Sequence, residues 1–480
     1  MKTSSHSKAF VFFILFFSAS CQSVQQHVPH SQKPNVIFIN VDDLGYQDVG
    51  FMGSQYYETP NIDRLPAEGM VFTRGYAGAA NCAPSRACLL SGQNTPRHGI
   101  YTVGNSDRGD ARTRQLIPVR NTLYLPDTTC TLGDLFKKAG YATGAFGKWH
   151  VSEDPSQQGF DVNYGGNQRG NPGKNGYISP YNNLPNLENA PAGEWLTDRL
   201  AAEAIRFIKS SRDKPFFLYL TYYAVHTPLM GKEELVAKYE KKAGSGGQEN
   251  PIYAVMVENV DTNIGLLMKT IDELGLRENT LIVFTLDNGG IRAISSQHPL
   301  RAGKGSYYEG GIRVPYIIRW PGLVKANSRS DVPIVNLDFF PTFMDILKVQ
   351  VSEQVLDGAS IVPLLEGKQI ANRPLFWHFP IYLEAYSPKE DNGRDPLFRT
   401  RPGSVVMLDN WKLHQYFEDG GIELYYLNED VGERHNLVDS YPEKANELLA
   451  VLENWRAKTN APIPTVKNPQ FDTEFHLTDR

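Results

Sequence analysis

Short runs of apolar, β-branched and aromatic residues alternate with helical patterns between about residues 35 and 348. Four of the runs predict buried strands, at residues 35–41, 141–146, 216–222 and 280–286. Apolar residues at helical spacing predict helices at residues 131–139, 195–210, 253–274 and 337–347. Alternation of this kind is typical of an α/β sheet with covering helices.

Two segments break this alternation. Residues 157–191 are rich in Gly, Asn, Pro and Tyr, which predicts an ordered surface insertion near the site rather than a part of the sheet. Residues 241–250 predict a small polar loop.

The pattern changes after Asp357-Gly358, and a second, smaller unit is predicted at residues 370–480, after a main domain at residues 34–369. Alternating runs at residues 404–408, 411–416 and 423–427 predict an antiparallel meander with turns at 409–410 and 419–421. An amphipathic helix at residues 441–458 is expected to cover that sheet, which makes the unit α+β.

Composition points to a catalytic or binding protein. The 480 residues include 41% hydrophobic and 21% charged residues, which is ordinary for a soluble globular chain. The net charge is -5 and no basic stripe stands out, so we expect no nucleic-acid partner.

The N-terminus has the pattern of an export signal. Lys2 and Lys8 precede an apolar run at residues 9–17 and small residues at 18–20, which predicts a signal peptide at residues 1–20. The run is too short for a good membrane span. Cys21 resembles the lipidated cysteine of bacterial lipoproteins, although Ser18 stands where leucine is commonest, and residues 21–33 predict a tether. We expect export to the periplasm or cell surface, with a lipid on Cys21 as membrane anchor; ordinary secretion is the alternative.

The chain contains four cysteines, Cys21, Cys82, Cys88 and Cys130. If Cys21 is lipidated or removed and Cys82 is modified, Cys88 and Cys130 remain, either as a disulfide or as two buried thiols. No zinc-type spacing is present.

Acidic residues follow two of the predicted strands. Asp42 and Asp43 come after the first strand, and Asp287 and Asn288 come after the fourth. Ligands of open α/β sheets bind beyond the carboxyl ends of the strands. Oxygen ligands of this type favour Ca²⁺, with Mg²⁺ as the alternative, whereas a turn or helix cap would explain Asp42 and Asp43 alone.

Basic residues follow the other strands. Lys148 and His150 come after the second strand, His226 comes after the third, and Lys304 lies in a glycine-rich segment. Any one of them alone is more often an ordinary surface residue. Their shared placement at strand ends predicts a cleft that handles anions.

Residues 82–92 combine a thiol, a helix start and an arginine. Pro84 and Ser85 favour a helix start, Arg86 lies one turn in, and Gly92 is able to end the helix. The N–H groups of a helix N-terminus and the planar fork of Arg86 both favour an oxyanion near Cys82. A buried structural cysteine is the alternative.

This Cys-x-Pro-Ser-Arg motif resembles the signature of the formylglycine-dependent sulfatases, which belong to the alkaline phosphatase superfamily. Further segments look like motifs of that family and occur in its order, although Ser91 and Leu286 replace a frequent threonine and a frequent serine. The resemblance covers most of the mature chain and implies a large mixed, mostly parallel sheet between helices, with a smaller C-terminal α+β domain on an antiparallel sheet. The matching segments are residues 40–45, 147–150, 226–228, 287–289, 303–305, 319–322 and 338–342.

The resemblance also implies the site. Cys82 would be oxidised to formylglycine (3-oxoalanine) by a formylglycine-generating or anaerobic sulfatase-maturating enzyme, and its hydrate would attack sulfur. Ca²⁺ would be held by Asp42, Asp43, Asp287, Asn288 and residue 82. The nucleophile and sulfate would be contacted by Arg86, Lys148, His150, His226 and Lys304. Among these, His226 would protonate the leaving oxygen, with Lys304 nearby, and His150 would accept a proton as sulfate is expelled.

The resemblance implies a sulfated carbohydrate as substrate, such as ulvan, carrageenan or a glycosaminoglycan. His298 and the segment Tyr177–Tyr181 are candidates for sugar contacts, with loop packing as the alternative. Two other functions stay open: a phosphoester hydrolase of the same superfamily, and a non-catalytic lipoprotein that binds sulfated glycans.

Overall fold

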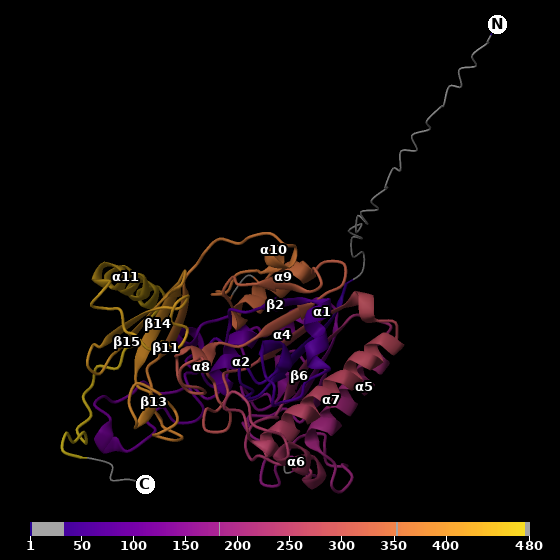
Figure 1. The fold of residues 1–480 in the computed structure, drawn as a ribbon, viewed down its shortest axis with the longest axis horizontal. Coiled ribbons are helices and arrows are strands. Elements are labelled where there is room, and N and C mark those ends of the chain that lie inside the picture. The colour runs from indigo at the N-terminus through magenta and orange to yellow at the C-terminus, as the bar shows by residue number, and fades with distance from the viewer. Residues whose placement is uncertain (2–32, 182, 352–353, 476–480) are drawn as a thin grey trace.

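The computed structural model describes residue 1 and residues 33–181, 183–351 and 354–475 (Figure 1). The predicted signal peptide and Cys21 lie outside these residues. Within the described ranges, no helix has the length and apolar character needed to cross a membrane.

An eight-stranded mixed sheet forms the centre of the larger part of the molecule, in the order β5-β4-β6-β1-β7-β8-β2-β9. Neighbouring strands are parallel except where β8 pairs with β7 and with β2. The strands are β1 (Asn35–Val41), β2 (Met70–Phe72), β4 (Ala142–Gly147), β5 (Val162–Tyr164), β6 (Phe216–Tyr222), β7 (Thr280–Leu286), β8 (Tyr316–Arg319) and β9 (Ser328–Ser330).

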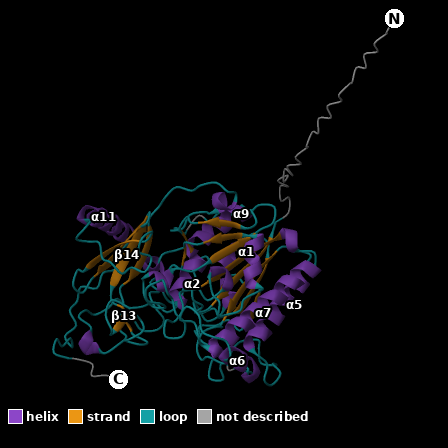
Figure 2. Cartoon of the chain, in the orientation of Figure 1, coloured by secondary structure: helices purple, strands orange, loops and turns teal. Residues whose placement is uncertain are grey.

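Helices cover both faces of this sheet, as Figures 1 and 2 show. On one face lie α5 (Leu196–Ser211) and α7 (Pro251–Glu273), with Phe207 of α5 against Phe146 and Phe216. On the other lie α4 (Leu132–Lys138) and α9 (Phe339–Leu347), with Phe136 stacked on Phe217 at 3.9 Å. Helix α2 (Cys82–Ser91) contacts both α4 and α9. Two covered faces explain why the central strands are continuous apolar runs.

The register of the central strands brings their carboxyl ends to one level. Val41 of β1 lies opposite Tyr222 of β6 and Leu286 of β7, and Gly147 of β4 lies opposite Thr221. The residues that follow these four strands therefore emerge at one edge of the sheet.

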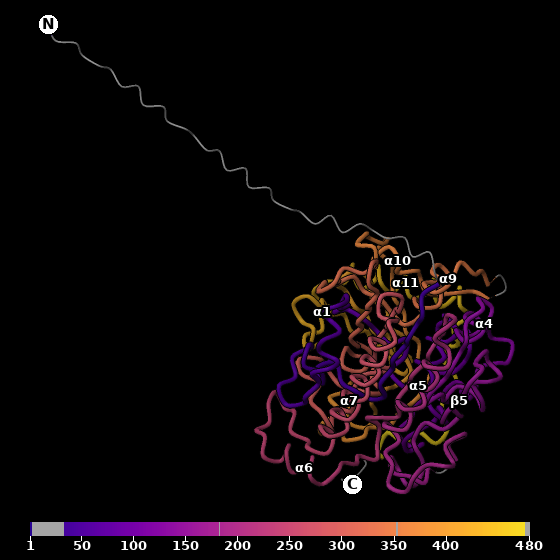
Figure 3. Tube along the Cα trace, turned by 90° about the vertical axis from the view of Figure 1, so that its right-hand side faces the viewer, coloured from indigo at the N-terminus to yellow at the C-terminus, as the bar shows by residue number. Residues whose placement is uncertain are grey.

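The predicted central strands and their covering helices are confirmed to within a few residues, as is the loop between α6 (Glu233–Glu240) and α7. The prediction that the insertion at residues 157–191 contributes nothing to the sheet is wrong, because β5 lies inside it and pairs with the outer side of β4. In the turned view of Figure 3, β5 lies toward one side of the molecule and α1 (Leu65–Glu68) toward the other. Three residues are too short a run to carry a strand pattern, so pairing to a preformed edge decides β5.

The smaller C-terminal unit contains the predicted antiparallel meander. Its strands are β14 (Gly403–Leu408), β15 (Trp411–Tyr416) and β16 (Ile422–Tyr426), and β11 (Leu375–Phe379) adds a fourth strand beside β14. Helix α11 (Pro442–Thr459) covers one face, where Trp455 stacks on Phe376 at 4.6 Å. The other face packs against the larger part. The remaining elements include α3 (Thr95–His98), α8 (Glu309–Ile312), α10 (Val362–Leu365) and the strand pairs β3 (Gly75–Tyr76) with β10 (Ile334–Val335) and β12 (Leu383–Glu384) with β13 (Phe398–Thr400).

A buried ion cluster joins the two parts. The ammonium of Lys412 on β15 lies 2.9 Å from the carboxylates of both Glu309 and Glu433, and all three side chains are fully buried. Glu309 has two further partners, Arg313 at 3.3 Å and the Tyr76 hydroxyl at 3.1 Å. Glu433 also accepts from the backbone N–H of Glu309 at 2.6 Å and lies 3.2 Å from Nε2 of His414, whose pKa is lowered by burial. Glu309 is the better stabilised anion because Arg313 is a second charged partner. Burial raises the pKa of Glu433 from 4.5 to about 7, against the opposing effect of Lys412.

Glu433→Gln should make stability less dependent on pH. Because the pKa is raised, the folded state keeps a proton on Glu433 at pH values where the unfolded state releases it. The stability that comes from this protonated carboxyl group is fully present below pH 4.5 and is lost as the pH rises through about 7. The melting temperature of the variant should fall less than that of the wild type between about pH 5 and about pH 8. Differential scanning fluorimetry across that range measures it, with the exposed Glu429→Gln as control. Equal pH slopes for Glu433→Gln and wild type would contradict the assignment.

Candidate active site

The four central strands bring the predicted site residues together at one edge of the large sheet. Asp42 and Asp43 follow β1, Lys148 follows β4, His226 lies after β6, and Asp287 and Asn288 follow β7. The carboxylates of Asp42, Asp43 and Asp287 offer oxygen atoms that all lie within 4.8 Å of one another, and all three residues are buried. The prediction that these strand ends meet is confirmed.

Backbone contacts fix the two adjacent aspartates. The backbone N–H of Asp42 donates to the carbonyl of Ala224 at 3.0 Å, and the carbonyl of Asp42 accepts from the N–H of Val225 at 2.7 Å. Asp43 adopts a left-handed backbone conformation with φ of 58°. In an extended strand, successive side chains point to opposite faces of the sheet. The left-handed turn at Asp43 interrupts that alternation, so the carboxyl groups of Asp42 and Asp43 face the same site.

Each carboxylate has its own buried cation. Lys148 lies 2.5 Å from Asp42, Lys304 lies 2.6 Å from Asp43, and Arg86 lies 2.9 Å from Asp287. Three carboxyl groups and three basic side chains thus occupy one desolvated volume. Burying such charges is tolerated because every one is paired.

The three carboxyl groups titrate differently because their surroundings differ. Burial and the neighbouring Asp287 raise the pKa of Asp42 well above its usual value, despite Lys148. Burial alone would also raise the pKa of Asp43 and Asp287, but Lys304 lowers the first and Arg86 lowers the second. Asp43 and Asp287 are therefore the most firmly ionised members of the group.

The chemistry of the donors fits a hard divalent cation. Within the described part of the chain, Oδ1 of Asp42 and Oδ1 of Asn288 are buried without a hydrogen-bond partner. Asn288 donates through Nδ2 to Asp43 at 2.9 Å, which turns its carbonyl oxygen away from Asp43. Unpartnered carboxylate and amide oxygens beside two ionised carboxylates are the set that Ca²⁺ or Mg²⁺ takes.

Cys82 is the first residue of α2, as the sequence predicts. It is 1% exposed, and its Sγ belongs to a second group of potential ligand atoms with Asp42 and His226. Gly92 ends the helix in a left-handed conformation with φ of 66°. Burial, followed by the charge of Asp42, raises the pKa of Cys82 to about 12, so an unmodified residue 82 is a neutral thiol and a poor nucleophile.

The described cysteines Cys82, Cys88 and Cys130 are all free thiols. Of the two alternatives for Cys88 and Cys130, the structure therefore has unpaired thiols. Cys88 is buried, with Sγ 3.6 Å from Nε2 of His98.

Arg86 connects three parts of the site. Its Nε and Nη2 both donate to Oδ2 of Asp287, at 3.0 and 2.9 Å, and its Nη1 donates to the carbonyl of Lys148 at 2.6 Å. The side chain is fully buried. Arg86 thus holds the ends of β4 and β7 in place, and the direct contact with sulfate that the resemblance implies stays a prediction.

The two site histidines are in different hydrogen-bonding states. His226 donates through Nδ1 to the carbonyl of Thr227 at 2.7 Å, and its Nε2 faces Asp43 at 3.7 Å. Burial and Lys304 lower its pKa to about 4. His150 has φ of 69°, and its Nδ1 is buried with no hydrogen-bond partner among the described residues. Burial and then Lys148 lower its pKa well below the usual value, so His150 is a neutral base.

The insertion orders the backbone around these histidines. His150 N–H donates to the carbonyl of Asn167 at 2.9 Å, and a Cβ added at Gly170 would lie 2.4 Å from the His150 ring. The hydroxyl of Tyr177 donates to the carbonyls of Tyr223 and His226, both at 2.7 Å. These roles of Asn167 and Tyr177 are not visible in the sequence, because they depend on backbone atoms distant along the chain.

Of the candidate sugar contacts, Tyr177 lies beside His226, but its hydroxyl is bonded to backbone carbonyls. The alternative role, packing of the loop, fits both Tyr177 and Tyr181. The hydroxyl of Tyr181 donates to the carbonyl of Glu194 at 2.9 Å. His298 is exposed, and its ring has no hydrogen bond to any described site residue. A role for His298 in sugar binding stays a prediction.

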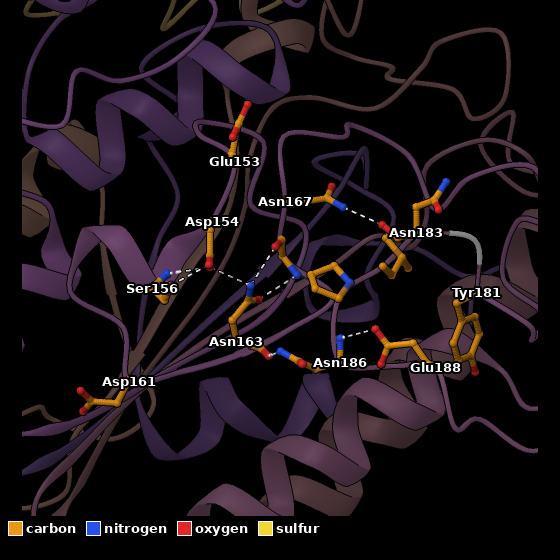
Figure 4. Close-up of a pocket in the computed structure, with 13 residues that line it drawn as sticks. Glu153, Asp154, Ser156, Asp161, Asn163, Asn167, Tyr181, Asn183, Asn186 and Glu188 are labelled. Atoms are coloured by element: carbon orange, nitrogen blue, oxygen red, sulfur yellow. Dashed lines mark hydrogen bonds between the residues drawn. The ribbon is translucent and has the colours of Figure 1, made fainter.

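The insertion also forms a polar pocket, shown in Figure 4, whose lining includes Asn167, the residue that accepts from the His150 N–H. Asn163 donates to Asp154 and to the carbonyl of Gly166, and Asn186 donates to the carbonyl of Asn163. Several carboxylates line this pocket and would repel an anion. It therefore supports the insertion, which is ordered as predicted, and does not suit a sulfated ligand. The carboxylates are Glu153, Asp154, Asp161 and Glu188.

Comparison with known proteins agrees with this geometry. A family model described as Sulfatase matches residues 34–349, and one described as N-sulphoglucosamine sulphohydrolase, C-terminal, matches residues 303–458. A sulfatase of Formosa agariphila is 33% identical over 94% of both chains. The N-acetylgalactosamine-6-sulfatase of Homo sapiens is 32% identical over 72% of this chain and 68% of its own length. The crystal structure of Ps i-CgsB in complex with k-i-k-neocarrahexaose is 30% identical, with a TM-score of 0.74, and covers 91% of this chain and 95% of that one. The predicted fold class is confirmed.

Arg86→Ala should destabilise the protein strongly. The substitution leaves Asp287 fully buried without its cation, which typically costs about 3–5 kcal/mol of the free energy of unfolding. Urea unfolding followed by fluorescence measures the loss. The control is Arg212→Ala, because Arg212 is 58% exposed and its loss should change the free energy by no more than about 0.5 kcal/mol. An Arg86→Ala protein as stable as wild type would show that Arg86 does not hold Asp287.

Proposed function

This chain belongs to the sulfatase family and is a sulfuric ester hydrolase, and we propose that it removes sulfate from a carbohydrate with formylglycine at position 82 and Ca²⁺ in the site. One observation carries the proposal. Cys82 starts α2 at the sheet edge where three carboxylates and three buried cations converge.

The carbohydrate class is supported by relatives of this chain. The mammalian relative is named for N-acetylgalactosamine 6-sulfate, and the similar solved structure holds a neocarrahexaose. Carrageenan, ulvan and glycosaminoglycans share the chemistry of sulfated, polyanionic sugars. Sulfated oligosaccharides are therefore the first substrates to test.

The site residues fit the metal and the modified residue. Asp42, Asp43, Asp287 and Asn288 would hold Ca²⁺ with carboxylate and amide oxygens. When present, the two groups would supply a hydrated aldehyde as nucleophile and a divalent positive charge beside the sulfate. The high pKa of the Cys82 thiol supports a modified residue 82, because an unmodified thiol would not be ionised at neutral pH.

Lys148 and Lys304 would stabilise charge on the transferred group. Both ammonium groups are buried and held in place by aspartates, at 2.5 and 2.6 Å. Burial lowers the pKa of each lysine, but Asp42 and Asp43 respectively raise it, so both remain charged. Fixed cations in a desolvated site stabilise developing negative charge without reorganising.

The histidines and Lys304 would move protons. His150 has an unpartnered Nδ1 that is free to accept a proton from the nucleophile. Neutral His226 keeps its proton on Nδ1, bonded to the Thr227 carbonyl, so its Nε2 must gain a second proton before it can give one to the leaving oxygen. Lys304 already carries protons and is the second donor.

We also propose the partners and location that the N-terminus and residue 82 suggest. The chain would be exported, with Cys21 as a lipid anchor, on the evidence of its first 21 residues. A formylglycine-generating or anaerobic maturating enzyme would modify Cys82. Because Cys82 is 1% exposed, that enzyme would act before this fold closes.

Cys82→Ala and Cys82→Ser should both lose multiple turnover, because neither side chain can form the aldehyde hydrate that expels sulfate. Sulfate release from defined sulfated oligosaccharides measures activity, and intact-peptide mass spectrometry shows whether residue 82 carries the aldehyde. The host must contain a maturating enzyme, and Cys130→Ser serves as control. Multiple turnover by Cys82→Ala would refute the mechanism, and faster release of phosphate than of sulfate from matched esters would favour a phosphoester hydrolase.

Ca²⁺ should raise the melting temperature of the wild type, because a ligand that binds only the folded state stabilises it. Asp287→Asn removes one ionised ligand and should reduce that increase. Thermal shift titrations with Ca²⁺ after chelator treatment measure it, and parallel titrations with Mg²⁺ test the other cation. The exposed Asp272→Asn is the control. Equal Ca²⁺ responses of Asp287→Asn and wild type would exclude this site.

A further inference from the structure

The loop that presents Lys304 is held by the C-terminal unit. Arg399 of β13 donates through Nη1 to the carbonyl of Lys304 at 3.1 Å, and Thr400 donates to the carbonyl of Gly305 at 2.6 Å. Gly305 has φ of 86°, and a Cβ there would lie 2.7 Å from Nη1 of Arg399. Strand β13 therefore lies directly against the backbone of the loop that presents Lys304.

Arg399 also supports an exposed aromatic ring. Its guanidinium carbon lies 3.3 Å from the centre of the Tyr386 ring. Arg399 is 5% exposed, whereas Tyr386 is 48% exposed. The guanidinium covers one face of the ring, and about half of the residue's surface is exposed to solvent. Tyr386 is thus fixed by the same arginine that contacts the backbone of Lys304.

Arg399 therefore links the Tyr386 ring to the backbone of Lys304, because its guanidinium contacts both. An exposed aromatic ring thus lies one side chain away from the residue that is proposed to contact sulfate.

Polar groups lie beside this ring. Glu384, two residues before Tyr386, pairs with Arg108 at 2.6 Å, and both side chains are more than one-third exposed. The carbonyl of Glu384 accepts from Nε of Arg399 at 2.8 Å. Arg108 offers N–H donors and Glu384 an acceptor at this rim, and the carboxylate of Asp391 accepts from the Tyr386 N–H at 2.6 Å, so the rim has charges of both signs, whereas only carboxylates supply charge to the pocket of the insertion.

We propose that Tyr386, backed by Arg399 and flanked by Glu384 and Arg108, is a sugar-binding platform at the rim of the sulfate site. A sugar ring of a sulfated oligosaccharide stacks on the exposed part of the Tyr386 ring, a sugar hydroxyl donates to the Glu384 carboxylate, and a sulfate group accepts from the Arg108 guanidinium. This proposal rests on the proposed function. It places substrate contacts in the C-terminal unit. Aromatic faces joined to a few fixed polar groups are typical of specific ligand sites.

Tyr386→Ala should weaken the use of oligosaccharides more than that of a small aryl sulfate. We expect KM for a carrageenan hexasaccharide or an oligosaccharide with N-acetylgalactosamine 6-sulfate to rise about tenfold, with a smaller change in kcat, because the stacking contact with the sugar ring is lost. The ratio of kcat/KM for the oligosaccharide to that for the aryl sulfate should fall by a similar factor. Tyr386→Phe keeps the ring and should restore most of the loss.

A binding experiment separates this proposal from the proposed reaction. Isothermal titration calorimetry of the Cys82→Ala protein, with and without Tyr386→Ala, measures affinity for the same oligosaccharides without turnover. The control is Tyr441→Ala, because Tyr441 is 50% exposed but packs on Trp411 in the C-terminal unit. Weaker binding by the Tyr386→Ala protein supports the platform even if no preparation releases sulfate. The absence of sulfate release would refute only the proposed reaction. Equal affinity with and without Tyr386, or binding of neither oligosaccharide, overturns the platform.

Discussion

Three carboxylates share one desolvated volume at the edge of the large sheet, and the rest of the structure around them serves to keep that arrangement stable. Asp42, Asp43 and Asp287 would repel one another and become protonated if they were alone. Buried cations at 2.5 to 2.9 Å from each carboxyl group counter this and hold the pKa of Asp43 and Asp287 low, whereas the pKa of Asp42 stays raised. The same cations are the groups that an anionic substrate would meet, so the interaction that stabilises the site also supplies its chemistry.

The sheet makes this charge arrangement possible because parallel strands end at one edge. β1 lies between β6 and β7, and β4 lies beyond β6, so their four carboxyl ends deliver acids and bases to one place. The C-terminal unit completes the site from outside. Arg399 and Thr400 fix the backbone at Lys304 and Gly305, and the Lys412 cluster fixes Glu309 shortly after them. The two parts of the chain therefore build one site.

Two polar regions near the site differ in charge and so in the ligands they suit. The pocket of the insertion is lined by carboxylates and is internally hydrogen-bonded, so it supports His150 through Asn167. The rim around Tyr386 carries arginines and an open aromatic ring. The carboxylates of the first region would repel a sulfated sugar, whereas the second region has Arg108 beside Glu384 and is where the sugar is proposed to bind.

The sequence by itself determined the elements with strong periodicity and the residues at their ends. The central strands, the helix that starts at Cys82 and its stop at Gly92, and the acidic and basic strand ends are all local patterns. Tertiary structure alone decided the features that depend on distant backbone: the short edge strand β5, the use of Arg86 to hold Asp287, and the support of His226 by Tyr177. It also decided the buried cluster around Lys412 and the stacking of Tyr386 on Arg399. A single residue with no pattern around it takes its role from the partners that folding brings to it, and those partners lie up to hundreds of positions away along this chain.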